Sequence, residues 1–145
     1  MKLVIQRVKE AGVKVENITK AEIGKGLLVL IGIGKDDNDS AIDWLVNKVT
    51  NLRIYENKQG KMHYSVKDIN GEILVIPQFT LYSNCNRGNR PDFTGAAAPR
   101  KAKELYHKFV ETIKTSFPKI KTGVFAAHME VSLINDGPVT IILEK

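Results

Sequence analysis

Two short segments rich in branched apolar residues, LVIQRV at 3–8 and LLVLIGI at 27–33, constrain the fold of this chain most strongly. Both are bounded by turn-forming residues and are shorter than a typical buried helix, so they are predicted to be buried strands. The apolar stretch at 26–34 is about half as long as a helix that crosses a bilayer. We therefore expect a sheet inside a globular protein, and no membrane span.

Apolar residues at helical spacing predict two helices. The first opens at Asp39-Ser40, where the Ser40 side chain can cap a free amide, and it carries an apolar stripe over 42–52. The second begins at Pro99, a favourable first helical residue, and Pro118 stops it.

Further strands complete an α/β arrangement. They are expected at 12–16, 53–55, 62–65 and 72–76, and two alternating segments at 129–133 and 139–143 predict a pair near the C-terminus. No internal repeat or linker interrupts the chain, so residues 1–145 are expected to form one domain. Strands interleaved with two helices favour a sheet that is covered by helices.

Composition indicates a globular protein in a reducing compartment. Apolar residues make up 43% and charged residues 26% of the 145 residues, which is typical of globular domains. Cys85 is the only cysteine, so no internal disulfide can form, and the charged N-terminal segment does not fit a secretion signal. We expect a cytoplasmic protein.

Positive charge is concentrated in the segment 87–121. The chain has a net charge of +6, and this segment holds nine Lys/Arg against three Asp/Glu. Such a cluster fits a surface that binds phosphates, and it equally fits an ordinary solvated surface. The candidate phosphate-facing residues are Arg87, Arg90, Arg100, Lys101, Lys103, Lys119 and Lys121.

Familiar catalytic signatures are absent from the sequence. There is no G-x-S-x-G elbow, Walker loop or H-E-x-x-H motif, and the three histidines, His63, His107 and His128, are widely scattered. We therefore expect neither a bound metal nor a cofactor, and each histidine is interpreted as a surface or packing residue.

Two segments stand out nonetheless. Pro77-Gln78-Phe79-Thr80-Leu81 follows the predicted strand at 72–76, and the end of a strand is where α/β sheets often bind ligands. If the segment has no role in binding, it is instead interpreted as a strand edge with a proline bulge. Asn135-Asp136-Gly137-Pro138 is either a simple hairpin turn or a cis-proline turn that presents backbone carbonyls.

These segments make the chain resemble a known family. QFTL at 78–81, NDGPVT at 135–140, RPDF at 90–93, KELYHKF at 103–109 and VIQRV at 4–8 are together similar to D-aminoacyl-tRNA deacylases of the bacterial and eukaryotic type. The resemblance covers essentially the whole chain. Its one clear departure is Pro77, where the family commonly has Ser, so any role for that hydroxyl or amide is absent or rerouted.

The resemblance implies a fold, an activity and an assembly. The fold is a mixed, strongly curved sheet flanked by two main helices, and the protein is a homodimer with its active site at the subunit interface. The activity is hydrolysis of the ester in D-aminoacyl-tRNA and in Gly-tRNA. The cis Gly137-Pro138 motif enters the neighbouring subunit's site and rejects the side chain of an L-amino acid by clash.

The resemblance also implies residue roles. Gln78, Phe79 and Thr80 line the aminoacyl pocket, where main-chain amides polarise the ester carbonyl. Phe125 and Met129 receive the terminal adenine, unless they are core residues of the last hairpin. Arg7, which would be costly to bury unpaired, holds carbonyls of the Gly137-Pro138 turn, unless it reaches solvent from an edge strand.

The mechanism that we favour is assisted by the RNA and has no covalent intermediate, because no base is tied to Thr80 by local sequence. Two other functions stay open at this point. One is a non-catalytic RNA-binding domain that uses the segment 87–121. The other is a broad small-ester hydrolase with Thr80 as nucleophile.

Overall fold

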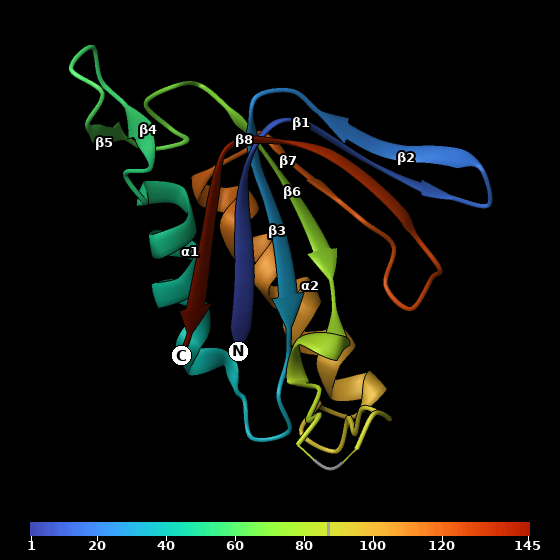
Figure 1. Ribbon diagram of the computed structural model, residues 1–145. Coiled ribbons are helices and arrows are strands. Elements are labelled where there is room, and N and C mark those ends of the chain that lie inside the picture. The colour runs from blue at the N-terminus through green and yellow to red at the C-terminus, as the bar shows by residue number, and fades with distance from the viewer. Residues whose placement is uncertain (87) are drawn as a thin grey trace.

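Two long strands, β1 (Lys2–Val15) and β8 (Glu130–Glu144), pair antiparallel along almost their whole length. The computed structural model describes residues 1–86 and 88–145, and both strands bend strongly in it (Figure 1). Register shifts between Gln6 and Glu10 accompany the bend. The separate strands expected at 3–8 and 12–16 are therefore one strand, because a bulge lets a strand turn sharply without ending.

The remaining strands make the sheet mixed and strongly curved. β3 (Gly26–Gly32) pairs with the first half of β1, and β2 (Ile18–Ile23) pairs with its second half. β6 (Glu72–Pro77) runs parallel to β3, and β7 (Ile120–Thr122) runs parallel to β6. The strand order is β2-β1-β3-β6-β7, with β8 added on β1. Because β2 also contacts β6 and β7, the sheet is nearly closed on itself.

Two helices cover one face of this sheet, as predicted (Figure 1). They are α1 (Ile42–Asn51) and α2 (Pro99–Ser116), and Pro99 is the first residue of α2. The predicted Ser40 cap is wrong. A short 3-10 turn, η1 (Asp39–Ala41), precedes α1, and its capping side chain is Asn38, whose oxygen accepts a hydrogen bond from the Ser40 amide at 2.9 Å.

Apolar residues on the two faces of the sheet form two cores. The larger core lies between the sheet and the helices and includes the fully buried Phe109 and Ile113 of α2 and Leu45 of α1. The smaller core lies inside the curl of the sheet and includes Leu28 and Leu74. Burying a side chain of this size stabilises the fold by about 1.5–3 kcal/mol, so these cores hold β3 and β6 rigidly.

A small hairpin, β4 (Tyr55–Glu56) and β5 (Met62–Tyr64), lies beside the sheet. The hairpin predicted near the C-terminus does not form, because β8 continues through Asn135-Asp136-Gly137-Pro138. Val8 pairs with Asn135 and Gln6 pairs with Thr140, so four residues of β8 lie opposite Arg7 alone. The segment is a wide bulge in one long strand, and not a turn between two strands.

Among the described basic residues of the segment 87–121, Lys101 lies apart from Lys119 and Lys121. Lys101, in the first turn of α2, donates to the Lys35 carbonyl at 2.7 Å. Lys119 and Lys121 lie beyond the other end of α2, where they bond to Asn70 and Glu22 respectively. Arg87 lies outside the described residues. Within those residues no helix is both long and apolar enough to cross a membrane.

Candidate active site

A cavity of about 650 Å³ opens at the carboxyl ends of the parallel strands β3 and β6. The N-terminus of α2 forms one of its walls, and the connection between β7 and β8 forms another. The cavity lies at the end of β6, where the sequence predicts a ligand-binding site. Its lining includes Ile31, Pro77, Gln78, Phe79, Phe93, Phe125, His128 and Met129.

The Gln78-Phe79-Thr80 segment turns away from the sheet at this edge. β6 ends at Pro77, and the Gln78 amide donates to the Ile31 carbonyl at 2.8 Å. The chain then enters a 3-10 turn, η2 (Phe79–Tyr82). Pro77 is tolerated because the following amide completes the ladder to β3. β6 is an interior strand, but its pairing with β7 ends at Val75, so Pro77 has a partner strand only on the β3 side.

Thr80 is bonded to its neighbour and not to a base. The Gln78 side-chain nitrogen donates to Thr80 Oγ1 at 2.5 Å. Within the described chain, that oxygen has no hydrogen bond to a histidine or a carboxylate. Thr80 is not among the residues that line the cavity, whereas Gln78 and Phe79 are. This geometry lacks the nucleophile–base pair that covalent catalysis requires.

Two main-chain amides in the same turn are available to a ligand. The amides of Phe79 and Thr80 are the first donors of η2, and helices leave such donors without a partner in the same helix. Neither amide has an acceptor among residues 1–86 and 88–145. Donors of this kind can bind an oxygen that gains negative charge during a reaction.

Exposed aromatic rings mark the mouth of the cavity. Phe79 is 56% exposed and meets Phe93 edge-on, with ring centroids 5.1 Å apart. Large apolar side chains that are exposed beside a cavity favour a binding surface. Phe93 belongs to the RPDF motif, but no local pattern in the sequence assigns it to the site, because none shows that the loop folds back onto η2.

Phe125 and Met129 line the opposite wall, on the connection from β7 to β8. The Val124 amide donates to Met129 Sδ at 3.4 Å, and a Cβ atom at Gly123 would lie only 2.7 Å from that sulfur. A larger residue at 123 would therefore require the flexible end of the Met129 side chain to move. His128, which we interpret from the sequence as a surface or packing residue, also lines the cavity.

Tyr106 of α2 supports this wall from behind. Its ring lies 5.8 Å from the Phe125 ring, and its hydroxyl donates to the Val75 carbonyl at 3.3 Å. Burial raises the pKa of Tyr106 to about 12, so the hydroxyl stays protonated and keeps its role as donor.

Arg7, Gly137 and Pro138 form a second group. Arg7 is only 6% exposed on an interior strand, so the alternative of an edge-strand arginine is wrong. Its Nε donates to the Asp136 carbonyl at 2.8 Å, and its Nη1 donates to the Ile54 carbonyl at 2.5 Å. The Gly137-Pro138 peptide bond is cis. Arg7 thus binds the bulge of β8 through the carbonyl that precedes Gly137.

The two groups are separated within one chain. Arg7 pairs with Leu27 near the start of β3, whereas the cavity begins at Ile31 near its end. Neither Gly137 nor Pro138 lines the cavity.

The described residues contain no group of three or more His, Cys, Asp or Glu side chains that could hold a metal ion.

Comparison with proteins of known name gives matches over the full length. A family model described as D-Tyr-tRNA(Tyr) deacylase matches residues 4–144. The D-aminoacyl-tRNA deacylase of Thermotoga petrophila is 56% identical over 145 residues, which are 100% of this chain and 97% of that protein. The protein of the same name from Thermosipho africanus is 53% identical, with the same coverage.

Solved structures agree with this comparison. One described as c-Myc DNA Unwinding Element Binding Protein is 41% identical, covers 100% of this chain and 99% of its own, and has a TM-score of 0.94. A probable eukaryotic D-amino acid tRNA deacylase has a TM-score of 0.86 at 16% identity, covering 98% of this chain and 97% of its own. At that identity the second match shows a shared fold.

Proposed function

This chain belongs to the family described as D-Tyr-tRNA(Tyr) deacylase, and we propose that it hydrolyses the ester bond of D-aminoacyl-tRNA, which releases free tRNA and amino acid. It is thus a hydrolase that acts on carboxylic ester bonds. The observation that carries the proposal is the cavity at the ends of β3 and β6, whose wall contains Gln78 and Phe79. The reaction is a proofreading step of translation in the cytoplasm.

The terminal adenosine and the aminoacyl group occupy different parts of the cavity. Phe125 and Met129 receive the adenine, because they supply an aromatic ring and a thioether on one wall. The ester carbonyl faces the Phe79 and Thr80 amides, which have no acceptor among the described residues. These amides stabilise the negative charge that develops on the carbonyl oxygen.

Water attacks the ester directly, with help from the RNA. Thr80 Oγ1 accepts a hydrogen bond from Gln78 and has no base beside it in the described chain, which argues against a covalent intermediate. The neighbouring ribose hydroxyl of the tRNA positions or activates the water, and preorganisation by the cavity supplies the rest.

Gly137 and Pro138 select against L-amino acids from a second subunit. They lie far from the cavity of their own chain, and the guanidinium of Arg7 holds their bulge in place. Exposed apolar residues on β8, Leu133, Ile134 and Ile142, give a second copy a surface to bury. The protein is therefore a homodimer whose active site lies at the subunit interface.

This filter works by exclusion, so it lets glycine pass. An L side chain would clash with the partner's bulge, whereas glycine has no side chain to reject. Gly-tRNA, including glycine mischarged on tRNA-Ala, is therefore a second substrate.

A nucleic-acid-binding protein without turnover is the second candidate. The relative described as a DNA-unwinding-element binding protein favours it. However, Lys101 and Lys119 lie at opposite ends of α2, and each already bonds to the protein itself. A continuous phosphate-binding surface would need such cations together and available.

The test compares D-Tyr-tRNA, L-Tyr-tRNA and Gly-tRNA with purified protein and no added metal. Rapid release of D-Tyr and Gly, with L-Tyr-tRNA spared, is the expected result. Salt-sensitive tRNA binding without turnover would favour the nucleic-acid-binding function instead. Efficient cleavage of D-aminoacyl esters that lack tRNA would favour a small-ester hydrolase.

A further inference from the structure

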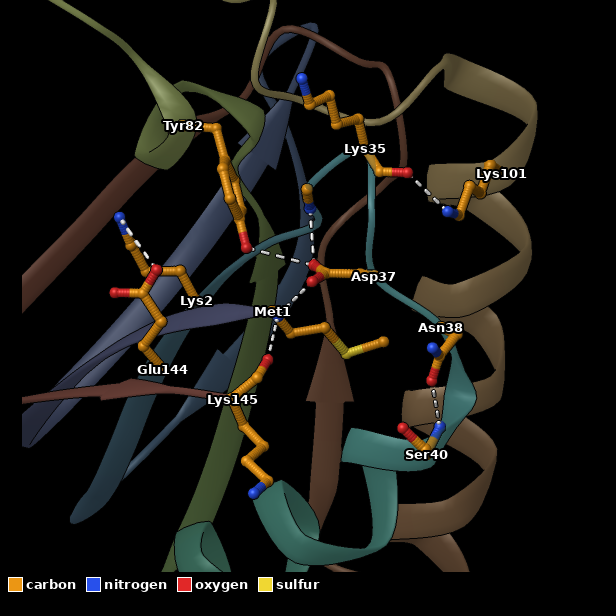
Figure 2. Close-up of polar contacts among 11 residues, drawn as sticks. Met1, Lys2, Lys35, Asp37, Asn38, Ser40, Tyr82, Lys101, Glu144 and Lys145 are labelled. Atoms are coloured by element: carbon orange, nitrogen blue, oxygen red, sulfur yellow. Dashed lines mark hydrogen bonds and ion pairs between the residues drawn. The ribbon is translucent and has the colours of Figure 1, made fainter.

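A charged network lies beside the cavity, centred on Asp37 in the turn after β3 (Figure 2). Asp37 Oδ1 lies 2.7 Å from the N-terminal ammonium of Met1, whose side chain is fully buried. Its other oxygen, Oδ2, accepts hydrogen bonds from the Gly34 amide at 2.6 Å and from the Tyr82 hydroxyl at 3.1 Å. One carboxylate therefore joins an ammonium group, the end of β3 and η2.

Tyr82 is the last residue of η2, the turn that begins with Phe79 and Thr80. Its ring packs directly on the chain that follows β3, since a Cβ atom at Gly34 would lie 2.6 Å from the ring. Burial and the Asp37 carboxylate both raise the pKa of Tyr82. Its hydroxyl is therefore protonated at neutral pH and donates to Asp37.

The bonds inside η2 are few. The Leu81 amide donates to the Gln78 carbonyl at 3.3 Å, and the Ser83 amide donates to the Thr80 carbonyl at 3.0 Å. A single 3-10 turn with such bonds is not stable alone, so its position depends on tertiary contacts. The Tyr82–Asp37 hydrogen bond connects the far end of this turn to the turn that follows β3.

The turn that carries Asp37 also holds a second wall of the cavity. The Lys35 amide donates to the Gly95 carbonyl at 3.0 Å, and the Ala97 amide donates to the Ile33 carbonyl at 2.9 Å. Ala97 lines the cavity. The turn after β3 is thus bonded both to η2 and to the loop that precedes α2.

We propose that Asp37 and Tyr82 are positioning residues for the deacylase reaction: their hydrogen bond fixes η2 so that the Phe79 and Thr80 amides face the ester carbonyl. This inference rests on the proposed function, because the cavity must be the place of hydrolysis. Neither residue touches the substrate. They act through the orientation of η2, and a shift of about 1 Å in such groups can reduce a rate about a hundredfold.

The decisive variant is Tyr82→Phe, which keeps the ring on Gly34 and removes the hydroxyl. We expect kcat for D-Tyr-tRNA to fall about tenfold with KM within about twofold, because adenine binding uses the other wall. Hydrogen exchange measured by mass spectrometry should become faster over 78–83 and stay unchanged over β1. Tyr64→Phe, on the exposed β5, is the matched control and should leave kcat, KM and exchange unaltered.

Asp37→Asn tests the same bond from the other side. It also leaves the Met1 ammonium without its anion, so its melting temperature should fall more than that of Tyr82→Phe. Its control is Asp39→Asn, two residues further along the chain, which removes an exposed ion pair with Lys108. The expected result is that Asp37→Asn reproduces the faster exchange over 78–83 and Asp39→Asn does not.

Two results would overturn the inference: wild-type kcat together with wild-type exchange in Tyr82→Phe, or a kcat loss that Tyr64→Phe shares. Failure of the proposed function looks different, because the wild-type protein itself would then leave D-Tyr-tRNA intact. In that case the exchange measurement still reports whether the hydroxyl of Tyr82 holds η2.

Discussion

At the scale of single residues, the hydroxyl of Thr80 decides between two chemistries. Its oxygen accepts a hydrogen bond from Gln78, and in the described chain no base is bonded to it. We therefore expect Thr80→Ala to keep kcat/KM for D-Tyr-tRNA within about tenfold of wild type, because water and not Thr80 attacks the ester. Single-turnover release of labelled D-Tyr measures this directly.

A covalent mechanism makes the opposite prediction. Removing a true nucleophile lowers the rate by about 10⁴-fold or more. Thr80→Ser is the matched variant, since it retains the hydroxyl and loses only a methyl group. A collapse of activity in Thr80→Ala that Thr80→Ser rescues would show that Thr80 is the nucleophile.

Arg7 is the second residue whose surroundings give a sharp expectation. Its guanidinium is buried, and it donates to the carbonyls of Asp136 and Ile54. Arg7→Met removes these donors from the buried Ile54 carbonyl and the partly buried Asp136 carbonyl, so the free energy of unfolding should fall by about 2–4 kcal/mol.

Urea unfolding at one fixed protein concentration checks the Arg7 prediction, because the stability of the proposed dimer would depend on concentration. The control is Arg53→Met, which removes an exposed arginine that donates to the His63 carbonyl. It should change the free energy by less than about 1 kcal/mol. Equal effects of the two substitutions would contradict the buried role of Arg7.

At the scale of elements, the connection between β7 and β8 shapes the cavity through Gly123. A Cβ atom there would lie 2.7 Å from Met129 Sδ and 2.8 Å from Ile76 Cδ1. We expect Gly123→Ala to displace Met129 and to raise KM for D-Tyr-tRNA about three- to tenfold, with a stability loss of only about 1 kcal/mol because both atoms end flexible side chains.

Steady-state kinetics and thermal unfolding measure both effects of Gly123→Ala. Gly24→Ala is the control, because its added Cβ would meet only Glu72 Oε2 at an ordinary 3.5 Å. An unchanged KM in Gly123→Ala would mean that Met129 does not bind the terminal nucleotide.

Local patterns predicted most elements but not where strands continue through irregular backbone. The helices at 42–51 and 99–116 and the strand at 26–32 follow from apolar spacing and from Pro99. The Asn135–Pro138 segment has turn chemistry, yet β8 passes through it. Pairing with β1 on both sides of the bulge overrides the local preference there, and that pairing is a tertiary effect.

The family resemblance, and not a local pattern, pointed to most of the candidate site. Gln78, Phe79, Phe125 and Met129 line one cavity, whereas Thr80, which the resemblance places in the same pocket, does not line it. Phe93 reaches the same cavity from the loop before α2, and His128 reaches it from the connection between β7 and β8. Neither segment has a periodic pattern from which its course could be predicted. The Asp37–Tyr82 bond likewise joins residues 45 positions apart, and such pairings arise only once β3 and β6 lie side by side.

At the scale of the whole molecule, the separation of the cavity from Gly137-Pro138 leads to a test of assembly. If each active site combines one chain's cavity with the partner's bulge, neither group alone makes a complete site. Gln78→Ala impairs the cavity and leaves the bulge intact. Gly137→Val impairs the bulge, because even a Cβ atom at 137 would lie 2.9 Å from Arg7 Nη2. It leaves the cavity intact, because Gly137 does not line it.

Mixing these two variants should therefore restore a filter that neither possesses. Each homodimer carries the same defect twice, whereas a mixed dimer has one site with an intact cavity and an intact partner bulge. After unfolding and refolding together in equal amounts, about half of the dimers are mixed, so chirally selective activity should recover to about a quarter of wild type. Hydrolysis of D-Tyr-tRNA relative to L-Tyr-tRNA measures it. Recovery no greater than the average of the separate variants would mean that each chain acts alone, and the exposed apolar residues of β8 would then need a different partner.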